Sequence, residues 1–309
     1  MKYKQIEGTD LNVSRIIMGC MRINSLSTRE LNGLIMGELD LGINFFDHAD
    51  VYAMGGCETA FGKAVDLRSG LRDKMIIQGK CGIRKVDDRA YYDFSKDYIV
   101  KATEAILKRL NTEYLDVLLL HRPDSLMEPD EAAEAFSALK TGGKVKYFGV
   151  SNFNSMQIEL LQSSVSDKLI FNQIQIGAGH TCLFDSGLAA NTKFEQGVDR
   201  TGSMLEYSRL KKIGLQAWSP LQYGMFEGVI LGNDRYEELN AKLEELAEKY
   251  NVNKTVIAIA WILRHPAKIQ VISGSTKLSH VEDYCTACDI ELSRDEWYQI
   301  YKAAGNIIP

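Results

Sequence analysis

Short, continuously apolar runs alternate with amphipathic segments along most of this 309-residue chain. Continuous apolar runs are typical of strands that are buried on both faces, as in parallel sheets. The pattern predicts eight such strands: Ile16–Gly19, Ile43–Asp47, Met75–Lys80, Asp116–His121, Tyr147–Asn152, Leu169–Gln175, Leu215–Ser219 and Gln270–Ser273.

Helix signals lie between the predicted strands. Side chains that begin helices occur with a partner three residues later in three places: Ser27 with Glu30, Asn154 with Gln157, and Ser293 with Glu296. Pro129 suits the first turn of a helix that Gly142 and Gly143 end. Apolar residues at helical spacing predict another helix over Tyr236–Tyr250, followed by one over Thr255–Arg264.

Eight strand–helix alternations fit either a doubly wound sheet or an eight-stranded barrel. A doubly wound sheet usually carries G-x-G-x-x-G after its first strand, and no such loop follows Ile16–Gly19. We therefore predict an α/β fold, a (β/α)8 TIM barrel with an N-terminal β-hairpin and extra C-terminal helices. The hairpin is expected around Gly8-Thr9-Asp10, at the lower end of the barrel, and residues 1–309 are expected to form a single domain.

Composition narrows the function classes. The formal net charge is -5, the pI is about 5.7 and no Lys/Arg run suggests a basic face, so we expect no nucleic-acid partner. The longest strongly apolar run, Val256–Leu263, is too short to span a bilayer, and the first residues lack the apolar stretch of a signal peptide. We expect a cytoplasmic protein without a membrane partner.

The six cysteines include one suggestive pair, Cys285 and Cys288. A zinc site would need a second pair, and a redox pair normally opens a helix after a strand. This pair falls late in a helical segment, so we expect reduced thiols and no metal.

Reactive side chains gather where the predicted strands end. Asp47 and Tyr52 follow the second strand, Lys80 ends the third, and His121 ends the fourth. Each has an ordinary structural explanation by itself, such as a loop cap, a packed aromatic ring or a buried polar group. Because the carboxyl ends of barrel strands meet at one rim, their joint placement predicts an active site there.

The sequence resembles the aldo-keto reductase family, and within it the bacterial branch of monomeric reductases. The resemblance covers nearly the whole chain and rests on separated motifs in the family's order: Phe46-Asp47 with Asp50 and Tyr52, Lys80, His121, Gly149–Phe153, Asn172-Gln173, Ala217–Leu221 and Trp261–Pro266. It implies the barrel fold, a small carbonyl substrate, a monomer and reduction of aldehydes or ketones to alcohols by hydride transfer from NADP(H).

The resemblance makes Tyr52 the general acid, and chemistry explains why three neighbours would help it. A phenol with a pKa near 10 donates poorly at neutral pH unless its anion is stabilised. An adjacent Lys80 would lower that pKa, Asp47 would hold Lys80 charged, and His121 would donate a second hydrogen bond to the carbonyl oxygen.

The resemblance also implies a cofactor site along the rim. It assigns the nicotinamide to Ser151, Asn152, Gln173 and Trp218, the pyrophosphate to Ser219, Leu221 and Gly224, and the adenosine phosphate to Gly274, Ser275, Thr276, Lys277 and His280. His280 stands where many members have arginine, and the lysine often found before Ser275 is absent. These departures leave NAD(H) as an alternative cofactor. A third, His48 beside Asp47, replaces the usual threonine or serine.

The substrate pocket is expected to include Met21, Arg22 and Arg122, with Cys81–Arg89, Gly177–Gly202 and the C-terminal tail. Such loops vary freely on one scaffold, so the sequence does not identify the substrate. The sequence argues against two other functions. A regulatory subunit of an ion channel would suit a chain in which some of the four residues Asp47, Tyr52, Lys80 and His121 had been lost, but all four are present. A metal-dependent hydrolase would need clusters of His and Asp at the ends of several strands, and the sequence shows no such clusters.

Overall fold

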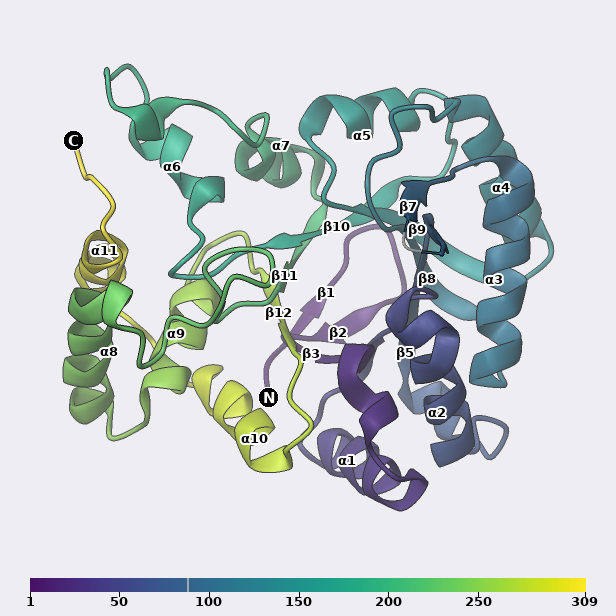
Figure 1. Ribbon diagram of the computed structural model, residues 1–309, viewed down its shortest axis with the longest axis horizontal. Helices are drawn as coiled ribbons and strands as arrows, with labels where there is room; N and C mark the ends of the chain where they lie inside the picture. Colours follow the sequence, from purple (N-terminus) through teal and green to yellow (C-terminus); the bar gives the residue numbers. More distant parts are fainter. Residues whose placement is uncertain (88) are drawn as a thin grey trace.

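The computed structural model describes residues 1–87 and 89–309, and its centre is a closed barrel of eight parallel strands (Figure 1). In chain order the barrel strands are β3 (Ile16–Gly19), β4 (Phe45–Asp47), β5 (Ile76–Cys81), β8 (Leu115–Leu120), β9 (Val145–Ser151), β10 (Leu169–Gln175), β11 (Gly214–Trp218) and β12 (Gln270–Ser273). The predicted (β/α)8 barrel is confirmed, and the strand boundaries differ from the predicted ones by at most two residues.

Helices surround the barrel and connect its strands (Figure 1). The helices that connect the strands are α1 (Thr28–Asp40), α2 (Gly56–Ala64), α3 (Lys96–Leu110), α4 (Pro129–Thr141), α5 (Ser155–Gln162), α7 (Met204–Lys211) and α9 (Lys254–Leu263), and α10 (Leu278–Ala287) follows the last strand. Further helices are α6 (Cys182–Leu188), α8 (Glu237–Tyr250) and α11 (Arg294–Ala303). The three predicted helix starts all form reciprocal capping boxes, at α1, α5 and α11.

The N-terminal hairpin consists of β1 (Tyr3–Gln5) and β2 (Asn12–Ser14), which pair antiparallel. Its apolar residues Ile6, Leu11 and Val13 belong to one buried cluster with barrel-interior residues such as Phe45 and Phe171. The hairpin therefore closes the amino end of the barrel, as predicted, and leaves the carboxyl end for the site.

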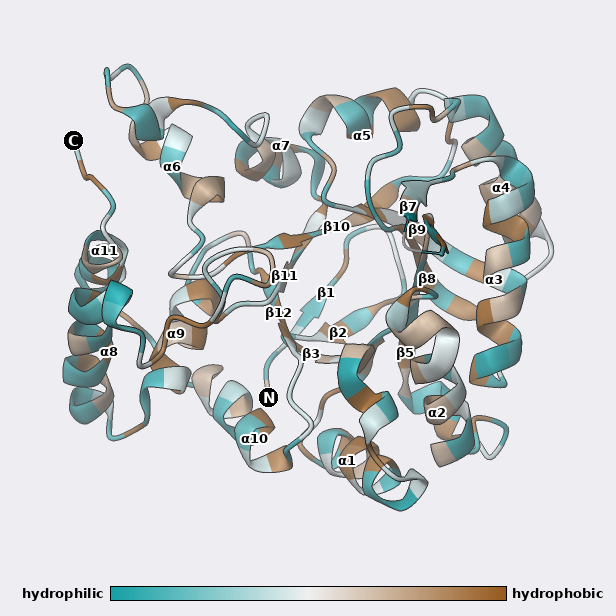
Figure 2. Ribbon diagram, viewed as in Figure 1, coloured by the Kyte–Doolittle hydropathy of each residue, from teal (hydrophilic) through white to brown (hydrophobic). Residues whose placement is uncertain are grey.

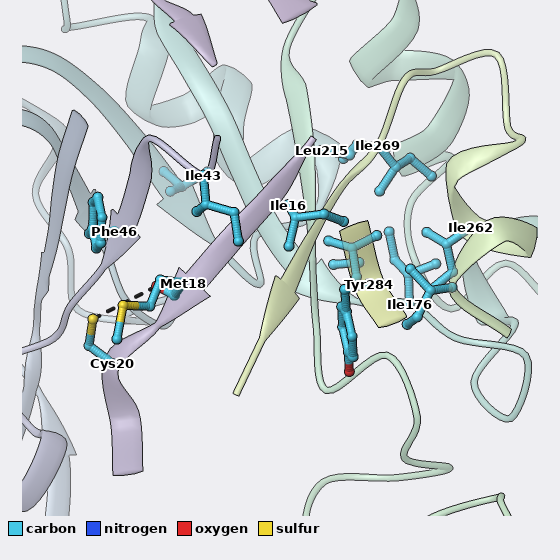
Figure 3. Close-up of a cluster of buried hydrophobic side chains, with 14 of the residues drawn as sticks. Ile16, Met18, Cys20, Ile43, Phe46, Ile176, Leu215, Ile262, Ile269 and Tyr284 are labelled. Carbon is cyan, nitrogen blue, oxygen red and sulfur yellow. Dashed lines mark hydrogen bonds between the residues drawn. The ribbon is translucent and has the colours of Figure 1, made fainter. Parts of the chain in front are cut away.

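A second apolar layer lies between the barrel and its helices. Figure 3 shows part of it, where Ile16 and Met18 of β3 lie near Ile43, Phe46 and Tyr284. The surface helices carry the matching pattern, with brown and teal residues alternating along α3 and α4 (Figure 2).

No helix of the described residues is both long and apolar enough to cross a membrane.

Two features of the structure were not predicted. Strands β6 (Ile83–Val86) and β7 (Arg89–Tyr92) form an antiparallel hairpin after β5, within the segment Cys81–Arg89 that was expected to line the pocket; residue 88 lies outside the described residues. Its side chains are mostly exposed, so the hairpin shows no apolar pattern. Helix α6 lies within Gly177–Gly202, the other segment expected to line the pocket.

Glu296 attaches α11 to α8, the two extra helices that lie side by side in Figure 1. It accepts hydrogen bonds from Lys249 Nζ at 2.7 Å and from the Tyr250 hydroxyl at 2.9 Å, both on α8, and one from the backbone N–H of Ser293 at 2.6 Å. Burial would raise the pKa of Glu296, but these donors outweigh it and lower the pKa to about 2.

We predict that Glu296→Gln destabilises the protein at neutral pH by roughly 1–3 kcal/mol, since it removes charge-assisted bonds. The lowered pKa stabilises the folded state above the ordinary glutamate pKa of about 4.3, and this contribution is lost as the pH falls towards about 2. Urea unfolding between pH 7 and 3 should therefore show that the difference in the free energy of unfolding between wild type and variant becomes smaller as the pH falls. Glu248→Gln, which removes an exposed carboxylate from α8, is the control. A difference that stays constant with pH would contradict this account.

Candidate active site

Strand alternation brings the reactive side chains into the barrel at its carboxyl end. Successive residues of a strand point to opposite faces, so Gln78 and Lys80 of β5 share the interior face. Asp47 pairs in register with Gln78, and Gln173 pairs with both Ser151 and Gln216. Residues from β4, β5, β9, β10 and β11 therefore meet in one layer. This layer lies on the carboxyl side of the buried apolar cluster formed by the hairpin and the barrel interior.

A buried ion pair between Lys80 and Asp47 lies in this layer. Lys80 Nζ is 2.5 Å from both carboxylate oxygens of Asp47, and the two side chains are 0% and 3% exposed. Burial lowers the pKa of Lys80, and the charge of Asp47 and its hydrogen bond oppose that shift. The contact supports the expectation that Asp47 holds Lys80 charged and in place.

Three buried glutamines support the carboxylate of Asp47. Gln78 and Gln173 each donate from Nε2 to Asp47 Oδ1, at 2.6 and 3.0 Å. The same two amides donate to Oε1 of Gln216, at 2.9 and 3.1 Å. Gln216 thus fixes the amide orientation that points both N–H donors at Asp47. Gln78 and Gln216 carry no signal in the sequence that predicts this role, and Gln173 was predicted only to hold the cofactor.

Tyr52 and His121 lie next to the ion pair. Lys80 Nζ is 5.1 Å from the Tyr52 ring centroid, and the His121 ring meets the Tyr52 ring edge-on with centroids 5.9 Å apart. Burial, and then the charge of Asp47, raises the pKa of Tyr52 well above its ordinary value. The direction is opposite to the lowering expected from Lys80, because burial of the phenol is the largest influence on its pKa. The phenol is therefore protonated at neutral pH.

His121 is a neutral imidazole in this environment. Burial lowers its pKa well below the ordinary value, and the positive charges of Lys80 and Arg122 add to the effect. A neutral imidazole keeps one N–H, so His121 can donate a hydrogen bond without competing with Tyr52 as an acid.

An unusual backbone path positions Tyr52. Ala53 and Met54, which follow it, both have left-handed φ angles, of 48° and 54°, and Gly55 has a φ of 83°. Left-handed conformations cost a non-glycine residue about 1–2 kcal/mol. Arg109 holds the turn from outside: a Cβ on Gly55 would lie 2.5 Å from its Nε, and the same nitrogen donates to the buried Glu58. Strain of this kind is typical of functional sites.

The four residues assigned to the nicotinamide form a continuous hydrogen-bonded chain. Trp218 Nε1 donates to Asn152 Oδ1 at 3.1 Å, Asn152 Nδ2 to Ser151 Oγ at 2.9 Å, and Ser151 Oγ to the Gln173 carbonyl at 2.8 Å. Asn152 has a left-handed φ of 63°. Because the Gln173 amide hydrogens point to Asp47 and Gln216, its Oε1 is left to accept a bond from a carboxamide.

The segment assigned to the pyrophosphate follows β11. Ser219 has a left-handed φ of 46°, and the carbonyl of Leu221 accepts a hydrogen bond from Ile230 at 2.9 Å. At Gly224 a Cβ would lie 2.3 Å from the carboxylate of Glu227. A pyrophosphate close to Gly224 would meet that negative charge, so this part of the assigned site fits less well than the rest.

The residues assigned to the adenosine phosphate surround the start of α10. Lys277, the N-cap residue, makes no side-chain capping bond, and a Cβ on Gly274 would meet nothing within 4 Å. Ser275 Oγ lies 3.4 Å from His280 Nδ1 and accepts from the Lys277 N–H at 3.1 Å. Thr276 is half-buried between them. A lysine, two hydroxyls and the first N–H groups of a helix are donors that suit a phosphate.

The residues expected to contact substrate differ in position. Met21 and Arg22 are exposed in the short 3-10 segment Cys20–Ser25 after β3, whereas Arg122 is half-buried. Burial lowers the pKa of Arg122, and nearby Tyr92 and Tyr52 oppose the shift. Arg122 directly follows His121, and its guanidinium lies over the Trp218 ring, 5.7 Å from the centroid.

His48, the unusual neighbour of Asp47, points away from this chemistry. It is fully buried, its ring meets Phe61 edge-on at 4.6 Å, and burial lowers its pKa to about 3. Within residues 1–87 and 89–309, no group of three or more His, Cys, Asp or Glu side chains could hold a metal ion.

Comparisons with known proteins agree with this geometry. Residues 15–304 match the model of the "Aldo/keto reductase family". "Uncharacterized oxidoreductase YcsN" of Bacillus subtilis is 38% identical over 97% of both chains, and "6-dehydroglucose reductase" of Agrobacterium fabrum is 34% identical over 95% of both. The crystal structure of an aldo-keto reductase from Klebsiella pneumoniae in complex with NADPH shares the fold, with a TM-score of 0.77 and 23% identity, over 98% of this chain and 95% of that one. The chain therefore belongs to the aldo/keto reductase family and is an NAD(P)H-dependent oxidoreductase.

Proposed function

We propose that this protein reduces aldehydes and ketones to alcohols with NADP(H), with Tyr52 as general acid and with Lys80, Asp47 and His121 in support. The observation that carries the proposal is the buried Lys80–Asp47 ion pair directly beneath a protonated Tyr52. A site for a regulatory subunit would not need a proton donor on a buried ion pair. We further propose that it acts as a cytoplasmic monomer.

When bound, NADP(H) would supply the hydride that adds to the carbonyl carbon. The chain's own residues then manage the negative charge that develops on the carbonyl oxygen. Tyr52 delivers the proton, and His121 donates a hydrogen bond that orients the oxygen. As the phenol becomes an anion, the adjacent Lys80 ammonium stabilises it, which matters more because burial alone makes that anion costly.

The cofactor would be held by the three groups of residues described above. Ser151, Asn152, Gln173 and Trp218 suit the carboxamide and ring of the nicotinamide, and the loop of Ser219, Leu221 and Gly224 would contact the pyrophosphate. The open start of α10 suits the adenosine phosphate through Gly274, Ser275, Thr276, Lys277 and His280. NAD(H) remains the alternative, since its binding would not need Lys277.

Tyr52→Phe should abolish most carbonyl reduction and leave cofactor binding in place. General acid catalysis typically contributes about 10²–10⁴-fold, so kcat for a good aldehyde should fall by that factor. NADPH oxidation gives the rate, and fluorescence titration gives cofactor affinity. Tyr207→Phe, which removes a hydroxyl from the outer helix α7, is the matched control. A Tyr52→Phe enzyme that keeps more than about a tenth of the rate would refute the acid assignment.

Gln216→Leu should impair the same step as Asp47→Asn, because Gln216 acts through the carboxylate of Asp47. Two hydrogen bonds of about 0.5–1.5 kcal/mol each are lost, so we expect a decrease in kcat of about tenfold. Without Gln216 to orient the two amides, the Asp47 carboxylate is held less firmly against Lys80, and a weaker ion pair opposes the lowering of the Lys80 pKa less effectively. The alkaline limb of the pH–rate profile should therefore move to lower pH.

The double variant tests whether the two residues form one unit. Gln216→Leu should cost little in the Asp47→Asn background, as expected for coupled residues. Additive losses, or an unchanged pH profile in Gln216→Leu, would show that Gln216 is only structural. Thermal unfolding of each variant separates loss of fold from loss of rate.

Lys277→Met should remove most of the preference for NADPH over NADH. The 2′-phosphate carries about two negative charges, and a charge-assisted hydrogen bond is worth roughly 1.5–3 kcal/mol, or about ten- to a hundredfold in affinity. The measurement is the ratio of the two dissociation constants at fixed salt, with Lys108→Met on α3 as the control. A wild-type preference for NADH, or a ratio of dissociation constants that Lys277→Met leaves unchanged, would show that this loop does not bind the phosphate.

A further inference from the structure

Arg122 follows His121 at the carboxyl end of β8, and aromatic rings and a thioether surround its guanidinium. Its Cζ lies over the Trp218 ring, 5.7 Å from the centroid, and its Nη2 is 3.2 Å from Met225 Sδ. Tyr52 and Tyr92 lie close enough to affect its pKa. The guanidinium therefore sits at the mouth of the proposed active site, between Tyr52 and the loop after β11.

Arg122 differs from the other arginines that are at least half-buried in the described part of the chain. Arg72, Arg84 and Arg109 each pair with a carboxylate, of Asp116, Asp93 and Glu58 respectively. Arg15 donates to the backbone carbonyls of Ile269 and Leu263. Within residues 1–87 and 89–309, the structure gives Arg122 no oxygen acceptor at all, only the weak acceptor Met225 Sδ.

The carboxylates of Asp124, Asp50 and Asp47 have hydrogen-bond partners other than Arg122. Asp124, two residues on, accepts from the backbone N–H groups of Phe94 and Leu126. Asp50 accepts from the Tyr98 hydroxyl at 3.0 Å, and Asp47 is committed to Lys80 and the glutamines. A guanidinium carries five N–H donors, and within the described residues those of Arg122 have no oxygen acceptor, so they are available to a ligand.

We propose that Arg122 binds a carboxylate of the substrate, so that the preferred substrates are aldehydes or ketones that also carry a carboxylate group. The planar guanidinium matches the two carboxylate oxygens, and a bidentate pair of this kind is strong and orienting. Because Arg122 directly follows His121 and its guanidinium lies over the Trp218 ring, the anion and the reacting carbonyl belong to one molecule. The inference rests on the proposed carbonyl reductase function and specifies its substrate class.

The test compares two substrates that differ only in charge. Para-formylbenzoate and para-formylbenzamide have nearly the same shape, and both are reduced at the formyl group. In the wild-type enzyme kcat/KM should be about ten- to a hundredfold higher for the benzoate, the range of a charge-assisted hydrogen bond. Arg122→Gln should bring this ratio of kcat/KM values near one. Arg122→Lys should retain part of the preference for the benzoate, because lysine keeps the positive charge but cannot form the two parallel hydrogen bonds of a guanidinium.

Arg68→Gln is the charge-matched control. Arg68 is exposed in the loop that leads towards the amino end of β5, at the opposite end of the barrel, and bonds Asn111. The variant should leave the ratio unchanged. A wild-type ratio near one, or a ratio that Arg122→Gln does not lower, would overturn the proposal and favour neutral hydroxyls as the partners of Arg122.

Measurements of ligand binding distinguish a failure of the carboxylate proposal from a failure of the proposed reductase function. If neither aldehyde is reduced, the reductase proposal fails, and calorimetric titration with benzoate and benzamide then decides the fate of the carboxylate site. Tighter binding of benzoate that Arg122→Gln abolishes would support the site. Equal affinities for the two ligands would refute it whether or not the enzyme turns over.

Discussion

The buried ion pair between Lys80 and Asp47 is the constraint on which the rest of the site depends. Removing two charges from water costs several kcal/mol per ion, and the pair offsets that cost only if further hydrogen bonds satisfy both groups. The carboxylate receives two such bonds, from Gln78 and Gln173. The need to orient those two amides in turn explains Gln216, which accepts from both.

This polar layer is stable because the barrel below and around it is apolar. The hairpin residues Ile6, Leu11 and Val13 fill the amino end, and the interior side chains of Phe45 and Phe171 meet edge-on above them. Water is thereby excluded from one side, so the ion pair can interact only with groups at the carboxyl end. The same exclusion raises the pKa of Tyr52 and lowers that of His121, which keeps both neutral.

The sequence was sufficient to predict the barrel and the grouping of Asp47, Tyr52, Lys80 and His121 at one rim, because continuous apolar runs mark buried parallel strands and their carboxyl ends share one rim. It could not indicate the roles of Gln78 and Gln216, since a glutamine within an apolar strand has no pattern that distinguishes a support from an interruption. It indicated that Lys80 lies near Tyr52, but not that burial of the phenol raises the pKa of Tyr52. The hairpin β6–β7 was missed because exposed strands carry no apolar alternation.

The distribution of charge connects the two proposed anion sites. The chain has a formal net charge of -5, so its overall field repels both an anionic cofactor and an anionic substrate. At physiological ionic strength charges are screened beyond about 8 Å, and binding is therefore decided by the nearest cations. In the proposed function, Lys277 at the start of α10 and Arg122 beside His121 would supply these cations, whereas Lys80 is paired with Asp47. The cation proposed for catalysis would thus be held by a carboxylate of the protein, and the cations proposed for binding would be left for ligands.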